Sequence, residues 1–251
     1  MSKASSTDPW LPYRKPRAPA SARLFCFPHA GAGATVFRGF QEALPATIEV
    51  CAVQLPGREN RLREAPIADL AKLVPQIADG LAPHLAPPFA FFGHSMGSIL
   101  AFELARELRR RGRPLPAHLF ASACPAPHLP DDDATHHLPD DALLARLRDL
   151  GGMPDELLAH RELMEMLLPV FRADASITET YVHTSEPPLD IPFTAFGALS
   201  DAKATRADMD AWRRHTSRAF ALAMIPGDHF YIQGEGRAPM LTAVARALGG
   251  L

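Results

Sequence analysis

Short apolar runs alternate with longer segments of helical period through most of this chain, and no other feature limits its possible folds as strongly. Strands that alternate with helices form a parallel sheet with helices on its faces, so the sequence predicts an α/β fold. The runs are apolar throughout rather than at every second residue, which predicts burial of both faces of the sheet. The six candidate strands are residues 23–27, 48–55, 89–93, 117–123, 193–199 and 220–225. The helical segments are about 36–44, 67–85, 97–111, 205–218 and 237–248.

A segment of about 70 residues without a strand signal, 124–192, separates the fourth and fifth candidate strands. It contains two amphipathic runs, 141–150 and 156–171, and it is too long for an ordinary connection between strands. We therefore predict a helical lid inserted at this point of a single domain, residues 22–251. Residues 1–21, rich in Pro, Ser and basic groups, are expected to be a flexible tail.

The charge balance and the cysteines limit the possible partners and compartment. The chain carries 26 Lys and Arg against 28 Asp and Glu, a formal net charge of −2, which argues against a nucleic-acid-binding protein. No stretch approaches the roughly 18 apolar residues of a membrane span, and no apolar region precedes the charges near the N-terminus. Cys26, Cys51 and Cys124 are odd in number and lie in or beside apolar runs, so buried free thiols are expected. We expect a soluble, cytoplasmic protein with neither nucleic acid nor a membrane as partner.

The pentapeptide Gly-His-Ser-Met-Gly, residues 93–97, joins the third candidate strand to a helical segment. In a strand–turn–helix context, the two glycines leave space for a sharp turn that lifts the serine hydroxyl out of the sheet. The N-terminal end of the helix would also favour a developing negative charge. The alternative is a structural turn that merely contains a serine. The flanking pattern favours Ser95 as the nucleophile of a serine hydrolase.

An acid and then a histidine follow later strands, in the order that such a serine requires. Asp201 follows the fifth candidate strand and His229 follows the sixth, so both should emerge beside Ser95 at the carboxyl edge of the sheet. We therefore predict His229 as the general base and Asp201 as the acid that orients it. Asp228 is adjacent to the histidine and poorly placed to reach its far ring nitrogen. Competing residues lie on a helix, in the lid or at the start of a strand: Asp208, Asp210, His118, His136, His137 and His215.

Two backbone N–H groups are expected to stabilise the oxyanion that forms when the serine attacks. One belongs to Met96, the residue after the nucleophile. We assign the other to Ala30, in the loop of small residues 27–33 that follows the first strand. A glycine-rich turn without a catalytic role is the alternative. The loop lacks the third glycine of the G-x-G-x-x-G dinucleotide motif, and we expect no cofactor and no metal.

Several motifs occur in one order: FPHAGAGA (27–34), VQLPGRENR (53–61), FFGHSMGSILAFELAREL (91–108), LPVFRAD (168–174) with Tyr181, and PGDHFYI (226–232). Together they resemble the type II thioesterases that accompany modular polyketide synthases and nonribosomal peptide synthetases. The resemblance extends from about Trp10 to the C-terminus, and the ordered set is far more specific than any single motif. The sequence departs from the family at Ala32, where many members have a pair of glycines after the alanine.

The resemblance implies an α/β-hydrolase fold with a helical lid and a stand-alone editing thioesterase. Such an enzyme hydrolyses acyl groups from the phosphopantetheine arm of acyl or peptidyl carrier proteins, which it meets in trans; we expect a monomer. Carried over to this chain, Ser95 is the nucleophile, His229 the base, Asp201 its acid, and Met96 and Ala30 the oxyanion donors. Two alternatives stay open: a general carboxylesterase or lipase-like hydrolase, and a non-hydrolytic partner of acyl carriers with a vestigial triad.

Other clusters have a plainer interpretation beside a functional one. The arginines 109–111 and Arg113 end the helix after the nucleophile, where cations are ordinary capping residues, although they suggest a docking patch for an acidic carrier. Residues 131–133 with His136 and His137 lack the ligand spacing of a metal site and are expected to be a solvated loop. Arg58 matches the family pattern without an assigned role. Three methionines of the predicted lid are expected to pack between helices rather than to line an acyl channel: Met153, Met164 and Met166.

Overall fold

A six-stranded sheet forms the centre of the molecule in the computed structural model, which describes residues 8–18, 20–130, 135–150 and 160–250. Its strand order is β2-β1-β3-β4-β5-β6, and every neighbouring pair is parallel. The predicted α/β class and parallel sheet are confirmed, with each strand within a few residues of its expected position. The strands are β1 (Ala22–Phe27), β2 (Ile48–Ala52), β3 (Phe89–His94), β4 (Leu119–Ser122), β5 (Phe193–Ala198) and β6 (Phe220–Ile225).

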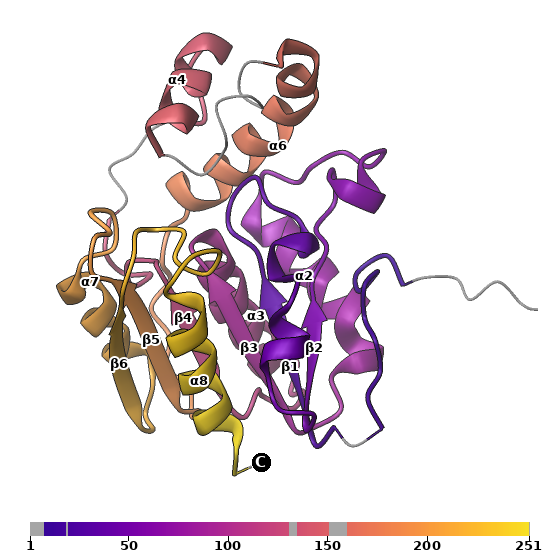
Figure 1. The fold of residues 1–251 in the computed structure, drawn as a ribbon, viewed down its shortest axis with the longest axis vertical. Coiled ribbons are helices and arrows are strands. Elements are labelled where there is room, and N and C mark those ends of the chain that lie inside the picture. The colour runs from indigo at the N-terminus through magenta and orange to yellow at the C-terminus, as the bar shows by residue number, and fades with distance from the viewer. Residues whose placement is uncertain (1–7, 19, 131–134, 151–159, 251) are drawn as a thin grey trace, which may run out of the picture.

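Helices cover both faces of this sheet, with α8 in front of the strands and α3 behind them in Figure 1. The α-helices are α1 (Phe40–Ala43), α2 (Leu70–Leu81), α3 (Met96–Arg110), α4 (Asp140–Leu150), α6 (Arg161–Glu179), α7 (Arg206–Asp210) and α8 (Arg237–Leu248). The shorter 3-10 helices are η1 (Ala34–Phe37), η2 (Glu59–Arg61), η3 (Ala82–His84) and η4 (Ala211–His215). Across the residues described, none of the helices has the length and apolarity to cross a membrane.

The expected helix at 36–44 is wrong as a single element. It divides into η1 and the four-residue α1, separated by Gly39, whose φ of +83° is left-handed and ends any continuous α-helix. The expected helix at 205–218 likewise divides into α7 and η4. By contrast, α8 has the predicted bounds.

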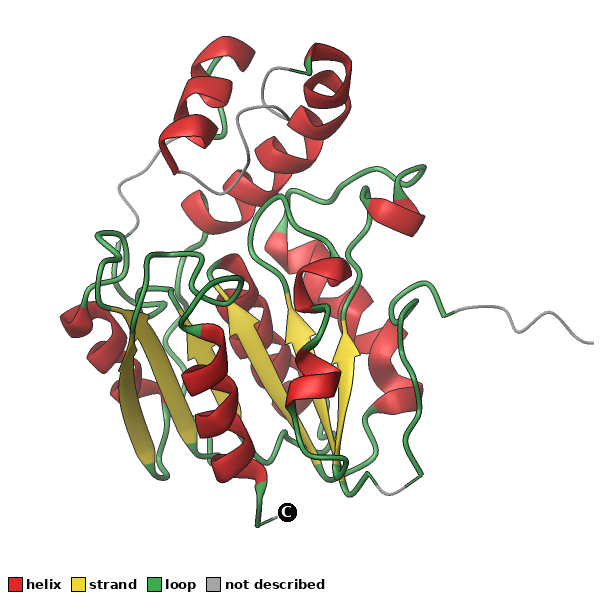
Figure 2. Ribbon diagram, viewed as in Figure 1, coloured by secondary structure: helices red, strands yellow, loops and turns green. Residues whose placement is uncertain are grey.

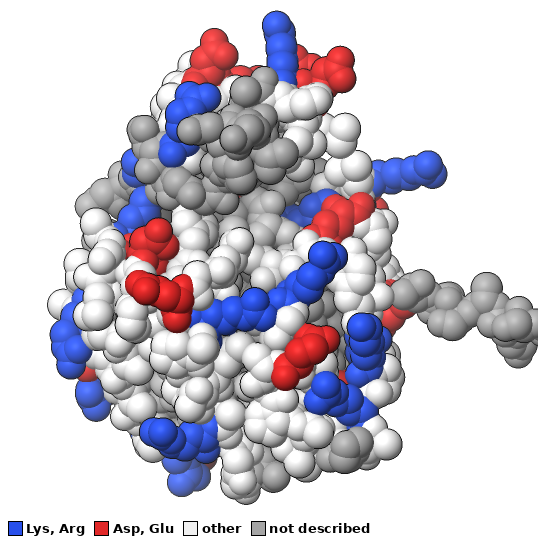
Figure 3. Space-filling view, viewed as in Figure 1, with Lys and Arg blue, Asp and Glu red and all other residues white. Residues whose placement is uncertain are grey.

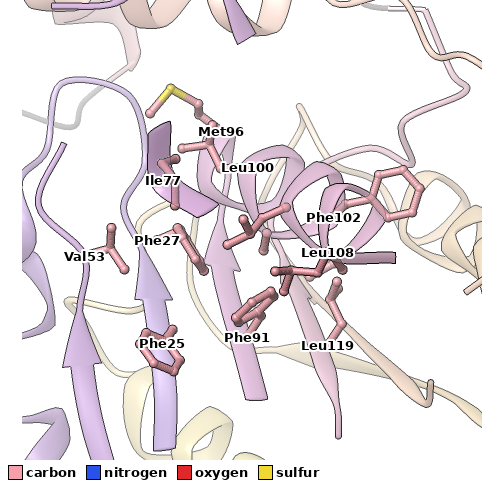
Figure 4. Close-up of a cluster of buried hydrophobic side chains, with 14 of the residues drawn as sticks. Phe25, Phe27, Val53, Ile77, Phe91, Met96, Leu100, Phe102, Leu108 and Leu119 are labelled. Atoms are coloured by element: carbon pink, nitrogen blue, oxygen red, sulfur yellow. The ribbon is translucent and has the colours of Figure 1, made fainter. Parts of the chain in front are cut away.

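Phenylalanines on β1 and β3 form the core between the sheet and α3. Figure 4 shows Phe27 and Phe91 pointing from their strands toward this helix, and their rings meet edge to face with centroids 5.4 Å apart. Alternate residues of the same strands, such as Cys26 and Phe92, pack in the second cluster on the opposite face with α1 and α8. Each fully buried phenylalanine contributes about 1.5–3 kcal/mol of transfer free energy. The two cores therefore fix the strand ends on which the site depends.

Strand β6 differs from the expectation that both faces are buried. It pairs only with β5, at the edge of the sheet, and Ala221 is exposed while Phe220 and Leu222 are partly buried. An edge strand has no neighbour on one side, so its apolar residues are shielded less completely. Continuous apolarity in the sequence does not distinguish such a strand from a central one.

The segment between β4 and β5 contains α4 and α6, which lie over the carboxyl ends of the strands, where the arrowheads point in Figure 2. The expected helices are therefore present there. The action of this segment as a lid remains a prediction. The expectations about residues 131–133 and Met153 lie outside the described residues.

In its described part, the N-terminal segment is not the flexible tail predicted for residues 1–21. From residue 8 onward it packs on the domain: Leu11 is 2% exposed, and the carbonyl of Trp10 accepts a 2.9 Å hydrogen bond from the Gln54 N–H. Arg14 Nε donates to Glu49 Oε1 over 2.6 Å. Two apolar side chains and an ion pair outweigh the Pro- and Ser-rich composition that suggested a tail; residues 1–7 lie outside the described part.

Candidate active site

Ser95 stands alone in the turn between β3 and α3. Its backbone has φ +52° and ψ −123°, a conformation that a residue with a side chain adopts only under strain. The glycines on either side are required by close packing. A Cβ on Gly93 would lie 2.1 Å from the Gly97 carbonyl oxygen, and one on Gly97 would lie 2.0 Å from that of Phe27. The pentapeptide therefore places the serine hydroxyl above the sheet, as its sequence predicts.

Three predicted residues come together at this turn. His229 Nε2 lies 3.1 Å from Ser95 Oγ, and His229 Nδ1 lies 2.7 Å from Asp201 Oδ2. Because an ionised carboxylate only accepts hydrogen bonds, Nδ1 carries the proton and Nε2 is free to accept one from the serine. The arrangement can remove the Ser95 proton, which is the chemistry of a serine nucleophile.

The Asp201 carboxyl is buried, with 1% of its side chain exposed. Burial alone would raise its pKa, but hydrogen bonds from His229 and from the N–H groups of Lys203 and Ala204 outweigh that effect and lower the pKa below its ordinary value. The group therefore stays ionised as a partner for the histidine.

The competing acids have other partners. Asp228 Oδ1 accepts from the Phe230 N–H over 2.8 Å, within its own loop. Asp208 forms a capping box with Thr205 at the start of α7, and Asp210 pairs with Arg213 on the surface. The structure thus favours Asp201 over all three.

The two predicted oxyanion donors, Ala30 and Met96, line one cavity with Ser95 and His229. Within the described part of the chain, neither backbone N–H donates to a protein acceptor. Met96 is the first residue of α3, where N–H groups have no partner inside the helix. Two free donors beside a nucleophile can bind the oxygen of a tetrahedral intermediate.

A hydrogen-bonded chain that sequence reasoning missed supports the histidine from behind. His94 Nε2 lies 2.9 Å from the His229 carbonyl oxygen, and His94 Nδ1 lies 2.7 Å from Ser122 Oγ. Tyr231 OH lies 2.5 Å from the same serine oxygen. Complete burial lowers the pKa of His94 far below its ordinary value, so the ring is neutral and carries one proton. That proton lies on Nε2, since the carbonyl can only accept. The only signal in the sequence was the position of His94 beside the nucleophile.

The cavity at Ser95 has a volume of about 950 Å³. Besides the loop after β1, it is lined by apolar side chains from the segment between β4 and β5: Pro125, Ala126, Leu129, Leu143, Leu147, Leu167 and Phe171. Met164 does not line it but packs against Phe171, and Met166 is 51% exposed. The helix-packing interpretation of Met164 is therefore favoured over an acyl channel.

The arginines at the end of α3 have partners within the chain. Arg109 and Arg110 each bind Glu186 over 2.7 Å, and Arg111 binds Glu107 over 2.6 Å. This pairing favours a structural role over a docking patch. Figure 3 shows the face with α8 in front and α3 behind, where Lys and Arg are interspersed with Asp and Glu.

Of the three cysteines, Cys124 lines the cavity at Ser95, whereas Cys26 lies on β1 and Cys51 on β2. Cys26, Cys51 and Cys124 are buried free thiols, as predicted. Among the described residues, no group of three or more His, Cys, Asp or Glu is placed to hold a metal ion.

Comparisons with known proteins place the chain in one family. The family model described as a thioesterase domain matches residues 22–250. The chain is 47% identical over 234 residues to linear gramicidin dehydrogenase LgrE of Brevibacillus parabrevis, covering 92% of this chain and 89% of that protein. It is 37% identical over 227 residues to thioesterase PikA5 of Streptomyces venezuelae, covering 90% and 81%. The solved structure of RedJ, a thioesterase of the prodiginine pathway in Streptomyces coelicolor, superposes with a TM-score of 0.88 at 44% identity, covering 93% of this chain and 89% of RedJ.

Proposed function

Because this chain belongs to the thioesterase family and has its α/β-hydrolase fold, we propose that it is a stand-alone editing enzyme of polyketide or nonribosomal peptide synthesis. Its substrates are acyl groups on the phosphopantetheine arm of carrier proteins. One observation carries the proposal: the hydrogen-bonded series of Ser95, His229 and Asp201 opens onto a large cavity lined mainly by apolar residues. The names of PikA5 and RedJ as thioesterases support it.

The acylation half of the reaction follows from the geometry. His229 Nε2 takes the proton of Ser95 Oγ as that oxygen attacks the thioester carbonyl. The N–H groups of Ala30 and Met96 bind the resulting oxyanion; loss of one such donor typically lowers kcat by about 10²–10³. The carbon–sulfur bond then breaks, and the histidine returns the proton to the departing thiol. An acyl-Ser95 ester remains.

Deacylation repeats the same steps with water as the nucleophile. His229 takes a proton from the water, and the water oxygen attacks the ester carbonyl. Collapse of the second oxyanion releases the acid and returns the proton to Ser95. Asp201 stays ionised and holds the histidine in the required tautomer throughout. No step calls for a cofactor or a metal.

The apolar wall of the cavity is where the acyl chain would lie. Leu143 and Leu147 of α4 and Leu167 and Phe171 of α6 line the same cavity as the nucleophile. We propose that this segment acts as the lid. The carrier protein is the partner, reached in trans by a monomeric, cytoplasmic enzyme.

Three other functions fit less well. An ester hydrolase would use the same three residues, but the loop after β1 reads HAGAGA where lipase-like enzymes have HGGG. A non-hydrolytic carrier partner would not need the 3.1 Å approach of His229 to Ser95. The name of LgrE suggests hydride transfer, but this chain lacks the third glycine of a dinucleotide fingerprint.

The decisive experiment incubates the protein with acyl-phosphopantetheinyl carrier protein and follows loss of the acyl mass. We expect release of the free acid by the wild type and none by Ser95→Ala. The proposal fails if the two proteins are equally inert toward the carrier while the wild type cleaves a simple oxygen ester.

A further inference from the structure

A buried ion pair lies directly behind the predicted oxyanion loop. Arg58 donates through Nη1 to Asp174 Oδ2 over 2.6 Å and through Nη2 to Oδ1 over 2.8 Å. The arginine side chain is 5% exposed and the carboxylate is fully buried. The two residues are 116 positions apart in the chain, one before η2 and the other on α6.

Both charged groups also bind the backbone of the loop that contains Ala30. Asp174 Oδ2 accepts a 2.7 Å hydrogen bond from the Gly31 N–H, and Arg58 Nη1 donates to the Ala32 carbonyl over 3.1 Å. The carbonyl of Ala30 lies 2.9 Å from His29 Nδ1. The peptide group between Ala30 and Gly31 is therefore held at both ends, by a histidine at its oxygen and by a carboxylate at its nitrogen.

Helix α6 touches the same loop at a second point, one turn earlier. A Cβ placed on Gly31 would lie 1.9 Å from the ring of Phe171, and Gly31 has a left-handed φ of +77°. Phe171 and Asp174 are three residues apart and so lie on one face of the helix. The loop is thus shaped to fit this face, and the ring that contacts it also lines the cavity.

Stability alone does not account for such a pair. Taking two charges out of water is costly, and apolar residues of similar size are often as stabilising in the same place. A charged pair that also binds two consecutive residues of a loop, Gly31 and Ala32, does more: it fixes the direction in which the backbone N–H groups point.

On the basis of the function proposed above, we propose that Arg58 and Asp174 are positioning residues that hold the Ala30 N–H in the geometry of the oxyanion hole. Arg58 lines the cavity at Ser95, but its guanidinium binds Asp174 and the Ala32 carbonyl. Asp174, on α6, binds the Gly31 N–H of the loop. Arg58 balances the charge of the carboxylate and binds the Ala32 carbonyl. The hole is then complete only while α6 is seated on the loop, so the helix that lines the acyl cavity also supports the donor.

The test compares Asp174→Asn, Arg58→Lys and the apolar double variant Arg58→Met with Asp174→Leu. Thioester hydrolysis should lose about 10²-fold in kcat, as for a catalytic group displaced by about 1 Å, with little change in KM. The affinity for a trifluoromethyl ketone analogue of the acyl-pantetheine substrate, which adds to Ser95 and needs the oxyanion hole, should fall in parallel. The affinity for the matching thioether, which lacks a carbonyl to attack, should stay at the wild-type level.

Arg61→Lys is the matched control, because Arg61 is also buried in the 53–61 motif but pairs with Glu64 and binds the Gln54 carbonyl, not the Ala30 loop. It should retain wild-type kcat. If single variants unfold, the double variant removes both charges together and stays informative. The proposal is overturned if a folded variant keeps wild-type kcat, or if both analogues lose affinity equally. If the wild type itself leaves the thioester intact, the proposed function fails, and the rate of Ser95 labelling by a fluorophosphonate then decides the positioning role.

Discussion

His94 Nε2 lies 2.9 Å from the carbonyl oxygen of His229, so the residue next to the nucleophile holds the backbone of the predicted base. The contact joins β3 to the loop after β6, which are 135 residues apart. This contact holds the main chain of His229 at a fixed distance from Ser95. The hydrogen bond to Asp201 holds the imidazole ring of the same residue. Two independent restraints thus act on one imidazole.

Replacing His94 by leucine should slow the reaction without removing any reacting group. The His229 loop would lose its anchor, and a displacement of about 1 Å lowers the rate by about 10²-fold. The Ser122 hydroxyl would also lose a buried partner, at about 1–3 kcal/mol in the free energy of unfolding. Steady-state kinetics and urea unfolding measure the two effects. A His94→Leu protein with kcat within twofold of the wild type would show that Asp201 alone positions the base.

Asp201→Asn should abolish most activity through the tautomer of His229. Asp201 Oδ1 accepts from the Lys203 and Ala204 N–H groups, so the asparagine oxygen would keep that position and its NH₂ would face His229 Nδ1. The ring would then carry its proton on Nε2 and could not accept one from Ser95. A loss of about 10⁴ in kcat is typical of this change in serine proteases.

Asp228→Asn is the matched control for that measurement. Its carboxylate accepts from the Phe230 N–H, and asparagine can keep this bond. We expect wild-type kcat. Equal losses in the two variants would assign the orienting role to the loop rather than to Asp201.

The positions of Ser95, Asp201 and His229 were predictable because each follows a strand, and parallel strands bring their carboxyl ends to one edge. Local pattern carried that information. The pairing of Arg58 with Asp174 was not predictable in the same way, since nothing local to either residue shows which of the many charges is buried against which. Its only trace was that both residues lie inside motifs of the family pattern.

For the N-terminal segment, the composition of the sequence predicted the wrong structure. Its prolines, serines and basic residues outnumber the apolar ones, so composition predicts a tail. Trp10, Leu11 and the ion pair of Arg14 with Glu49 nevertheless hold it on the domain. Gly39 shows a third case: a single left-handed residue interrupts a helix whose apolar periodicity continues on both sides. Apolar periodicity indicates which face of a helix is buried, but it does not show whether the helix backbone is continuous.

Acid should weaken the fold through Glu186. Burial would raise its pKa, but hydrogen bonds from Arg106 and Arg109 outweigh that effect and lower the pKa from 4.5 to about 2. Its contribution to stability is therefore fully present above about pH 4.5 and is lost as the pH falls toward 2. Glu186→Gln should be less stable than the wild type at pH 7, and the difference in Tm should shrink between pH 4.5 and 2. A difference that is constant over this range would mean that the arginines do not stabilise the carboxylate.

Leu11→Ala should lower the free energy of unfolding by about 2–5 kcal/mol, the usual cost of truncating a buried leucine. Leu11 is 2% exposed and packs in the cluster that contains Val53 and Ile77. Truncation would therefore remove buried apolar contacts and leave a cavity in this cluster. Tyr13→Ala is the control from the same segment, because Tyr13 is 49% exposed and surface changes stay within about 0.5 kcal/mol. Urea unfolding of the two variants distinguishes a docked segment from a tail. If the segment is docked, Leu11→Ala is less stable than the wild type and Tyr13→Ala is not. If it is a tail, both variants are as stable as the wild type.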